Sequence, residues 1–285
     1  MKNSILVRDL CKQFPDFTLD HVSFQVPQGR IVGFIGENGA GKSTTINLIL
    51  NELKRDSGAV ELLGGDPADP AVRDRVGVVF DSCSFPAVLT PRDVEKILAG
   101  VYSTWDSSCF HEYLKRFSLP ERRNIKTFSK GMKMKLSIAS ALAHRPKLLI
   151  LDEATAGLDP VVRDEILDLL LDFIQDEEHA VFFSSHITSD IQKIADYVVL
   201  IHQGNIIFEE EKDALLDNYG ILRCGKHTAV DPGDCIVRRE TGVSVEYLVR
   251  DRAAAGRKYP QAVADAASLE DIMLFYIKGE PACGE

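Results

Sequence analysis

The chain has 285 residues, 45% of them hydrophobic, so it can bury the core of one large domain and of a smaller part beside it. Its formal net charge of −10 at pH 7 argues against a general nucleic-acid binder, because such proteins hold the phosphate backbone with clustered lysines and arginines. The six cysteines contain no CxxC pair, so we expect neither a zinc site nor a disulfide framework.

Two strand-like runs open the chain, at residues 5–10 and 17–26. The second run alternates apolar and polar residues for most of its length, as a half-buried strand does. Phe14, Pro15 and Asp16 lie between the runs and predict a turn. We therefore expect a small antiparallel β part near the N-terminus.

Residues 30–53 read as a strand, a glycine-rich loop and a helix, and they contain the pattern Gly36-x-x-x-x-Gly41-Lys42-Ser43. Glycines let the backbone turn tightly and present N–H groups to phosphate oxygens at the positive end of the following helix. Lys42 then reaches the outer phosphates, and Ser43 offers its hydroxyl to Mg²⁺. A plain glycine-rich turn is the alternative, but the flanking strand and helix favour a phosphate loop. The residues expected to bind ATP here are Asn38, Gly39, Ala40, Gly41, Lys42, Ser43 and Thr44.

Two further strands are expected at residues 57–65 and 75–80, and the segment of about 82–146 is predicted to be mainly helical. Thr90-Pro91-Arg92-Asp93 has the sequence of a helix N-cap followed by a proline and a capping acid. Another helix follows from about Lys130 to Ala143 and ends before a proline. This segment is expected to form a helical insert between strand-rich parts.

The run Leu148–Leu151 is too short for a helix and is followed directly by Asp152 and Glu153. Such a continuous apolar run is typical of a buried strand in a parallel sheet. Helices and strands then alternate up to residue 210, which predicts an α/β fold whose core sheet is mostly parallel.

Ligands bind at the carboxyl ends of parallel strands, so the two acids should face the phosphate loop. Asp152 is placed to hold Mg²⁺, and Glu153 to polarise the attacking water. His186 follows the strand 180–185 and should reach the same edge, where an imidazole could bond the γ-phosphate or water. Helix capping by the two acids, and a purely structural histidine, are the alternatives.

These residues resemble the nucleotide-binding subunits of ATP-binding-cassette (ABC) transporters over roughly residues 3–210. In that resemblance Phe14 matches the aromatic that stacks on adenine, residues 36–44 match the Walker A loop and residues 148–152 the Walker B strand. Glu153 takes the position of the catalytic base, residues 156–159 match the D-loop, and His186 matches the switch histidine. Residues 128–132 occupy the place of the family signature.

The resemblance implies a P-loop NTPase cassette in which two copies, or this chain and a related ATPase subunit, pair head to tail around ATP. Ser129 and Gly131 would then contact the γ-phosphate bound by the partner. Separate transmembrane permease subunits would dock on the helical insert and be moved by ATP binding and hydrolysis. Residues 1–215 would be the ATPase domain and 216–285 a small α+β accessory or dimerisation domain.

Two positions depart from the family pattern. Asp81 stands where the family has a glutamine that touches Mg²⁺, and we expect it to be a further metal ligand. Lys130 replaces the first glycine of the signature, and its charge could offset Asp81 or a phosphate across the dimer, or could be solvated.

The resemblance implies a transporter subunit similar to those of bacterial exporters of peptides, toxins or antimicrobials. No apolar run reaches the length of a membrane span, so we expect the chain on the cytoplasmic side of the membrane, held there by its permease. A ribosome-associated or repair ATPase, an importer and a lipid or polysaccharide exporter are the alternatives. Nucleic acid is not an expected partner.

Overall fold

The computed structural model describes residues 2–225, 228, 230–240, 242 and 244–281. It divides into two units, Met1–Glu209 and Glu210–Glu285, which are described separately. The sequence predicts a domain boundary at residue 215, which lies within helix α8 (Lys212–Asn218). The two units of the structure divide a few residues earlier, between Glu209 and Glu210. Within the described ranges, no helix combines the length and apolar character needed to span a membrane.

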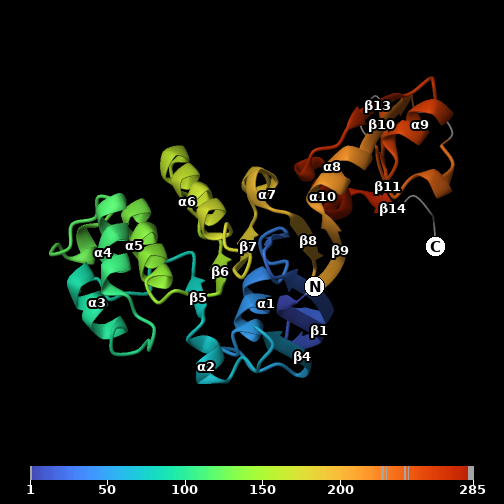
Figure 1. Ribbon diagram of the computed structural model, residues 1–285. Coiled ribbons are helices and arrows are strands. Elements are labelled where there is room, and N and C mark those ends of the chain that lie inside the picture. The colour runs from blue at the N-terminus through green and yellow to red at the C-terminus, as the bar shows by residue number, and fades with distance from the viewer. Residues whose placement is uncertain (1, 226–227, 229, 241, 243, 282–285) are drawn as a thin grey trace. The chain divides into compact units, whose positions relative to one another are not determined.

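The central sheet of the first unit has the strand order β5-β6-β7-β3-β8-β9 (Figure 1). Neighbouring strands from β5 to β8 pair in parallel, and β9 follows β8 after the turn at Gln203 and Gly204. Every residue of β6 and β7 is buried, as expected for parallel strands covered on both faces. The strands are β3 (Ile31–Ile35), β5 (Val76–Val79), β6 (Leu148–Asp152), β7 (Ala180–Ser185), β8 (Tyr197–His202) and β9 (Asn205–Glu211).

A second sheet, with the order β2-β1-β4, is antiparallel throughout. It consists of β1 (Asn3–Gln13), β2 (Thr18–Pro27) and β4 (Ser57–Leu62). A shared core joins this sheet to the central sheet and to helix α1 (Lys42–Ile49). Phe24, Phe34 and Phe182 lie at its centre, with ring centroids 5.2 to 5.4 Å apart. This core fixes the strand and the helix on either side of the glycine-rich loop.

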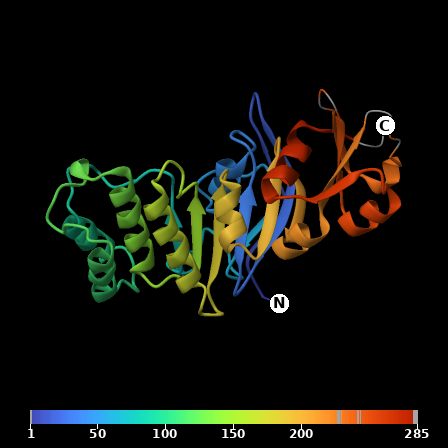
Figure 2. The ribbon, with the colours of Figure 1, turned by 90° about the horizontal axis from the view of Figure 1, so that it is seen from above.

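Helix α7 (Thr188–Ile194) packs on β3 and β7, and α6 (Pro160–Phe173) packs beside α7 (Figure 2). The close approach of α7 to β3 depends on Gly33. An added Cβ there would lie 2.3 Å from Cγ2 of Ile191, so only glycine fits.

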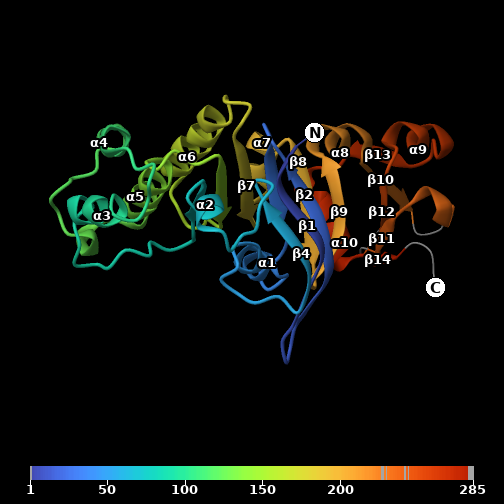
Figure 3. The same ribbon diagram turned by 60° about the horizontal axis from the view of Figure 1, so that its bottom comes forward.

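The predicted helical insert contains α3 (Pro91–Leu98), α4 (Ser107–Arg116), the 3-10 turn η1 (Ile125–Thr127) and α5 (Lys130–Leu142), with the short α2 (Pro70–Arg73) before it. Helices α3, α4 and α5 lie together, apart from α1 (Figures 1 and 3). The predicted capping box is present, because Thr90 accepts from the backbone of Asp93 and Asp93 accepts from that of Thr90.

The second unit contains an antiparallel sheet in the order β13-β10-β12-β11-β14. Its own core includes Leu222, Cys224, Val249 and Tyr259. The last helix, α10, starts at a capping box of Ser268 and Asp271. The elements are α8, β10 (Gly220–Gly225), the 3-10 turn η2 (Pro232–Asp234), β11 (Val237–Glu240), β12 (Ser244–Val249), α9 (Arg252–Lys258), β13 (Val263–Ala266), α10 (Leu269–Lys278) and β14 (Glu280–Pro281).

Candidate active site

The glycine-rich loop joins β3 to α1 and ends in left-handed backbone. Gly39 and Gly41 have φ angles of 85° and 113°, which side chains with a Cβ rarely adopt. Helix α1 begins at Lys42 with no side-chain cap and no acidic residue in its first turn. The backbone N–H groups of that turn therefore point from a helix N-terminus that no side chain caps, which is the arrangement that binds phosphate.

The ammonium group of Lys42 is held beneath this loop, and the side chain is only 5% exposed. Its Nζ donates to the carbonyl oxygens of Gly36 and Glu37, at 2.7 and 3.1 Å. The same Nζ lies 3.1 Å from Oε1 of Glu153, which forms an ion pair with it. A buried cation at a helix N-terminus fits the phosphates of a nucleotide.

Two carboxylates enter the site from the end of β6. Asp152 pairs with Ser184 of the neighbouring β7, and Ser184 Oγ donates to Asp152 Oδ1 at 2.6 Å. The backbone N–H of Glu153 is 3.1 Å from both the carbonyl oxygen and Oγ of Ser184. Glu153 has a φ of 52°, a left-handed conformation that is unfavourable for this residue type. Such strain is concentrated at functional sites, where the surrounding structure imposes it.

His186 contacts the same Glu153 carboxylate from the end of β7. Its Nδ1 lies 2.5 Å from Oε2 of Glu153, while Oε1 faces Lys42. The glutamate side chain is 15% exposed and the histidine 42%. The structure thus brings Lys42 and His186 to opposite oxygens of the Glu153 carboxylate. This partly buried carboxylate can accept a proton from a water molecule at the loop.

The sequence reasoning did not single out Ser184, which contacts Asp152 and Glu153, or Asp190, a buried aspartate on α7. Burial raises the pKa of the Asp190 carboxyl, while the nearby Thr155 hydroxyl and the guanidinium of Arg163 act in the opposite direction. Nη1 of Arg163 lies 4.0 Å from Oδ1 of Asp190. Ser184 could have been found from the sequence, because it lies two residues before His186 and must share its sheet edge.

Phe14 lies at the tip of the β1–β2 hairpin and is half-buried. Its ring centroid is 6.2 Å from that of Phe17. Phe17 in turn abuts the phosphate loop, since its Cζ is 2.9 Å from the point where a Cβ on Gly41 would lie. The hairpin therefore presents an aromatic surface beside the loop.

Ser129 and Gly131 lie at the start of α5, where Ser129 caps the helix by accepting from the N–H of Met132. Helix α5 lies apart from α1, so this chain does not bring its own signature residues to its own phosphate loop (Figures 1 and 3). Asp81 and Lys130, the two departures from the family pattern, line one cavity of about 470 Å³.

The family described as ABC transporter matches residues 19–156. The chain is 36% identical over 220 residues to the bacitracin transport ATP-binding protein of Bacillus licheniformis, which covers 75% of this chain and 72% of that protein. It is 32% identical over 210 residues to a lantibiotic transport ATP-binding protein of Streptococcus pyogenes, covering 73% of this chain and 90% of that protein.

The fold agrees with this assignment. A solved ATP-binding subunit of an ABC transporter superimposes with a TM-score of 0.67 at 27% identity, covering 74% of this chain and 91% of the other. The predicted fold class and enzyme class are thereby confirmed. The chain belongs to the ATP-binding subunits of ABC transporters, which bind nucleotide and hydrolyse ATP.

Proposed function

We propose that this chain drives the export of a peptide antibiotic, or of a related toxin or antimicrobial, through separate transmembrane subunits. The similarity to the bacitracin and lantibiotic transport proteins supports this substrate class. The observation that carries the ATPase function is the junction of Lys42, Glu153 and His186 at one sheet edge. In this proposal the chain works at the cytoplasmic face of the membrane, held by its permease.

The phosphate loop would hold the nucleotide. The uncapped first turn of α1 offers backbone N–H groups, and Lys42 offers an ammonium group that already lies among oxygen acceptors. We assign phosphate binding to residues 38–44, and stacking on the adenine ring to Phe14 at the adjoining hairpin tip. Lys42 and the hairpin aromatics then fix the two ends of ATP.

The oxygen donors at this edge fit Mg²⁺, which prefers carboxylate and hydroxyl ligands together with phosphate oxygens. Asp152 is oriented by Ser184, and the exposed Ser43 follows Lys42 at the helix start. We assign Ser43 and Asp152 to the metal, with Asp81 as a further ligand. A bound Mg²⁺ would supply positive charge to the phosphate oxygens.

Glu153 is assigned the role of general base, and His186 that of a group that orients Glu153 and bonds the γ-phosphate. ABC ATP-binding subunits dimerise and work with permeases. The position of α5 away from α1 supports a head-to-tail pair in which Ser129 and Gly131 complete the partner's site. The partner is a second copy or a related ATPase subunit.

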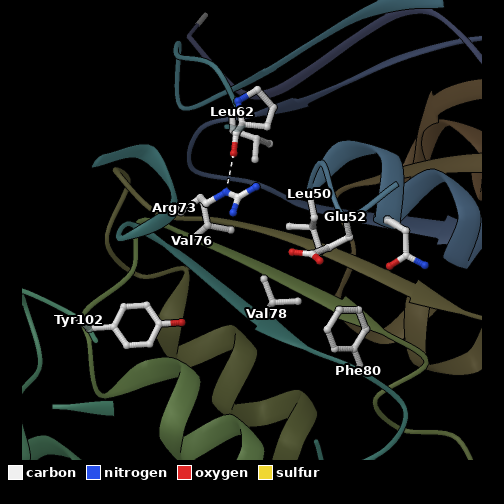
Figure 4. A pocket seen from close by; sticks show the side chains of 10 residues that line it. Leu50, Glu52, Leu62, Arg73, Val76, Val78, Phe80 and Tyr102 are labelled. Carbon is white, nitrogen blue, oxygen red and sulfur yellow. Dashed lines mark hydrogen bonds between the residues drawn. The ribbon is translucent and has the colours of Figure 1, made fainter. Parts of the chain in front are cut away.

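A concave surface suits the permease contact. A pocket of about 480 Å³ lies where the end of α1, β4, α2 and β5 meet Tyr102 of the helical insert (Figure 4). Leu50, Val78 and Phe80 supply apolar lining, and Glu52 and Arg73 supply charge at its wall. We propose that a cytoplasmic segment of the permease docks here, where Tyr102 of the helical insert meets the rest of the cassette.

Residues 216–285 are proposed to act as an accessory or dimerisation domain, since they form part of a unit with its own core. Truncation after Asn218 should leave ATP binding intact and weaken the ATP-dependent dimer. Equal dimerisation by the truncated and full-length chains, measured by light scattering, would remove this role.

The transport function is tested in cells. A strain that depends on this chain should lose tolerance to bacitracin or to a lantibiotic when it carries Glu153→Gln, and the wild-type chain should co-purify with a multi-span membrane protein. Co-purification with ribosomes in its place would favour a non-transport ABC ATPase. Unchanged tolerance together with a permease complex would point to an importer or a lipid or polysaccharide exporter.

A further inference from the structure

A β-bulge gathers three potential metal ligands on the β1–β2 hairpin. Leu10 pairs with Val22 and Lys12 with Leu19, so two residues of β2, Asp20 and His21, lie opposite the single residue Cys11 of β1. In a regular strand the side chains of neighbouring residues point to opposite faces, but a bulge re-aims one of them. Both Asp20 and His21 are accordingly exposed, with side chains 55% and 72% accessible.

The bulge brings the ligand atoms of these side chains close together. The sulfur of Cys11, a carboxylate oxygen of Asp20 and a ring nitrogen of His21 all lie within 4.8 Å of one another. The backbone N–H of His21 donates to Cys11 Sγ at 3.2 Å, and His21 Nδ1 lies 2.6 Å from Asp20 Oδ1. Tetrahedral zinc with bonds of about 2.0 to 2.3 Å places its ligand atoms roughly 3.3 to 3.7 Å apart, so small side-chain rotations suffice.

The sulfur, nitrogen and oxygen donors of this cluster indicate which metal it would bind. Thiolate and imidazole are ligands for zinc and are poor ligands for magnesium or calcium, which prefer oxygen. The nearest cation along β1, Lys12, is engaged by Asp56 Oδ1 at 2.7 Å and does not neutralise the cluster. We propose that Cys11, Asp20 and His21 form a Zn²⁺ site with water as the fourth ligand. Binding releases the thiol proton of Cys11 to solvent, because the thiolate is the ligand.

This cluster could not be read from cysteine spacing, which indicates zinc only where cysteines or histidines recur at short intervals. Here Cys11 is separated by the hairpin from Asp20 and His21, and the bulge makes them neighbours. The site is also connected to the phosphate loop. The N–H of Asp20 donates to the carbonyl of Gly204, whose N–H donates to the carbonyl of Ala40, at 2.9 and 3.0 Å.

The test measures metal binding directly. Full-length protein, reduced and washed with chelator, is titrated with Zn²⁺ by calorimetry and with Co²⁺ by absorption spectroscopy. We expect one Zn²⁺ per chain at this site, a thiolate-to-cobalt charge-transfer band, and a melting temperature that rises with Zn²⁺. Cys11→Ser should abolish the band, and His21→Ala should weaken zinc binding by about 10-fold or more, because each removes one of three protein ligands.

Cys83→Ser is the matched control, since Cys83 is also half-buried and free but lies outside the hairpin. It should keep the band and the zinc stoichiometry. His186→Ala should also keep the band and the zinc stoichiometry. That result would show that the metal binds at the hairpin and not at the ATPase site. Should Cys11→Ser fail to fold, Asp20→Asn and His21→Gln alter exposed side chains and serve as the test. A cobalt complex without a thiolate band, or an unchanged band in a folded Cys11 variant, overturns the proposal.

Discussion

Glu153 and His186 are 33 positions apart in sequence, yet Oε2 of the glutamate lies 2.5 Å from Nδ1 of the histidine. Adjacent parallel strands end side by side, which brings the two residues together. The other carboxylate oxygen of Glu153 pairs with Lys42. Both oxygens are therefore engaged, and we expect phosphate to draw the Lys42 ammonium away and leave Oε1 available to a water molecule.

The first prediction concerns the base. Glu153→Gln keeps the shape of the side chain but cannot accept a proton, so ATP turnover should fall by about 10²-fold or more. Nucleotide affinity should persist, and the ATP-held dimer should accumulate. Phosphate release, fluorescent-nucleotide binding and size-exclusion chromatography measure the three quantities.

Lys42→Ala provides the contrast to this variant, because it removes the buried ammonium that faces the loop. It should lose nucleotide affinity itself and form no ATP-dependent dimer. Hydrolysis at the wild-type rate by Glu153→Gln would show that another group activates the water.

The second prediction concerns Ser184, whose hydroxyl donates to Asp152 at 2.6 Å. Ser184→Ala should free the carboxylate to rotate and should raise the Mg²⁺ concentration for half-maximal ATPase activity by about 10-fold, the scale of losing an outer-shell partner. Ser185→Ala is the matched control, because Ser185 is equally buried on the same strand but accepts from the N–H of Ile187. Equal Mg²⁺ dependence in the two variants would exclude an orienting role for Ser184.

The central sheet and the sites at its edge were predictable because each has a local signal. The apolar run before Asp152 is long enough for one strand only, and the phosphate-loop pattern is continuous in sequence. Parallel pairing places the carboxyl ends of β6 and β7 side by side, so the sequence alone predicts that Glu153 and His186 are neighbours.

Other features depend on strand register or on packing between segments far apart in sequence, which local sequence patterns do not predict. Strand β10 carries little local signal in the sequence, since it begins and ends in glycine and pairs with residues 244–249 and 263–266. The bulge opposite Cys11 follows from how two strands align, and the shared cavity of Asp81 and Lys130 from how the insert packs.

The third prediction concerns that cavity. A carboxylate at position 81 binds Mg²⁺ more strongly than an amide but adds negative charge near the γ-phosphate. ATP-driven dimerisation should therefore depend more steeply on Mg²⁺ in the wild type than in Asp81→Gln. Lys130→Gly should weaken ATP-dependent closure without abolishing nucleotide binding. Superimposable Mg²⁺ titrations of dimer formation for the wild type and Asp81→Gln would place Asp81 away from the metal.

The final prediction concerns a buried histidine at the end of the signature-bearing helix. His144 is 1% exposed and stacks on Tyr102, with ring centroids 4.0 Å apart and planes 9° from parallel. Burial lowers the pKa of His144 below its ordinary value of 6.5, while the nearby backbone of Val76 and Ser140 and, less strongly, the carboxylate of Asp74 oppose this shift. His144 therefore binds a proton less readily in the folded chain than in the unfolded chain.

The sign of the pH dependence follows from this difference in proton binding. Above pH 6.5 both states carry a neutral histidine and the group has no effect, whereas below it the unfolded state gains a proton and the free energy of unfolding falls. His144→Phe keeps an aromatic ring against Tyr102 and should lose this part of the acid sensitivity. His179→Phe is the control, because His179 stacks on Phe173 at 4.3 Å but is 21% exposed. Urea unfolding between about pH 7.5 and 5.5 measures the slopes, and equal slopes for the wild type and His144→Phe would contradict the assignment.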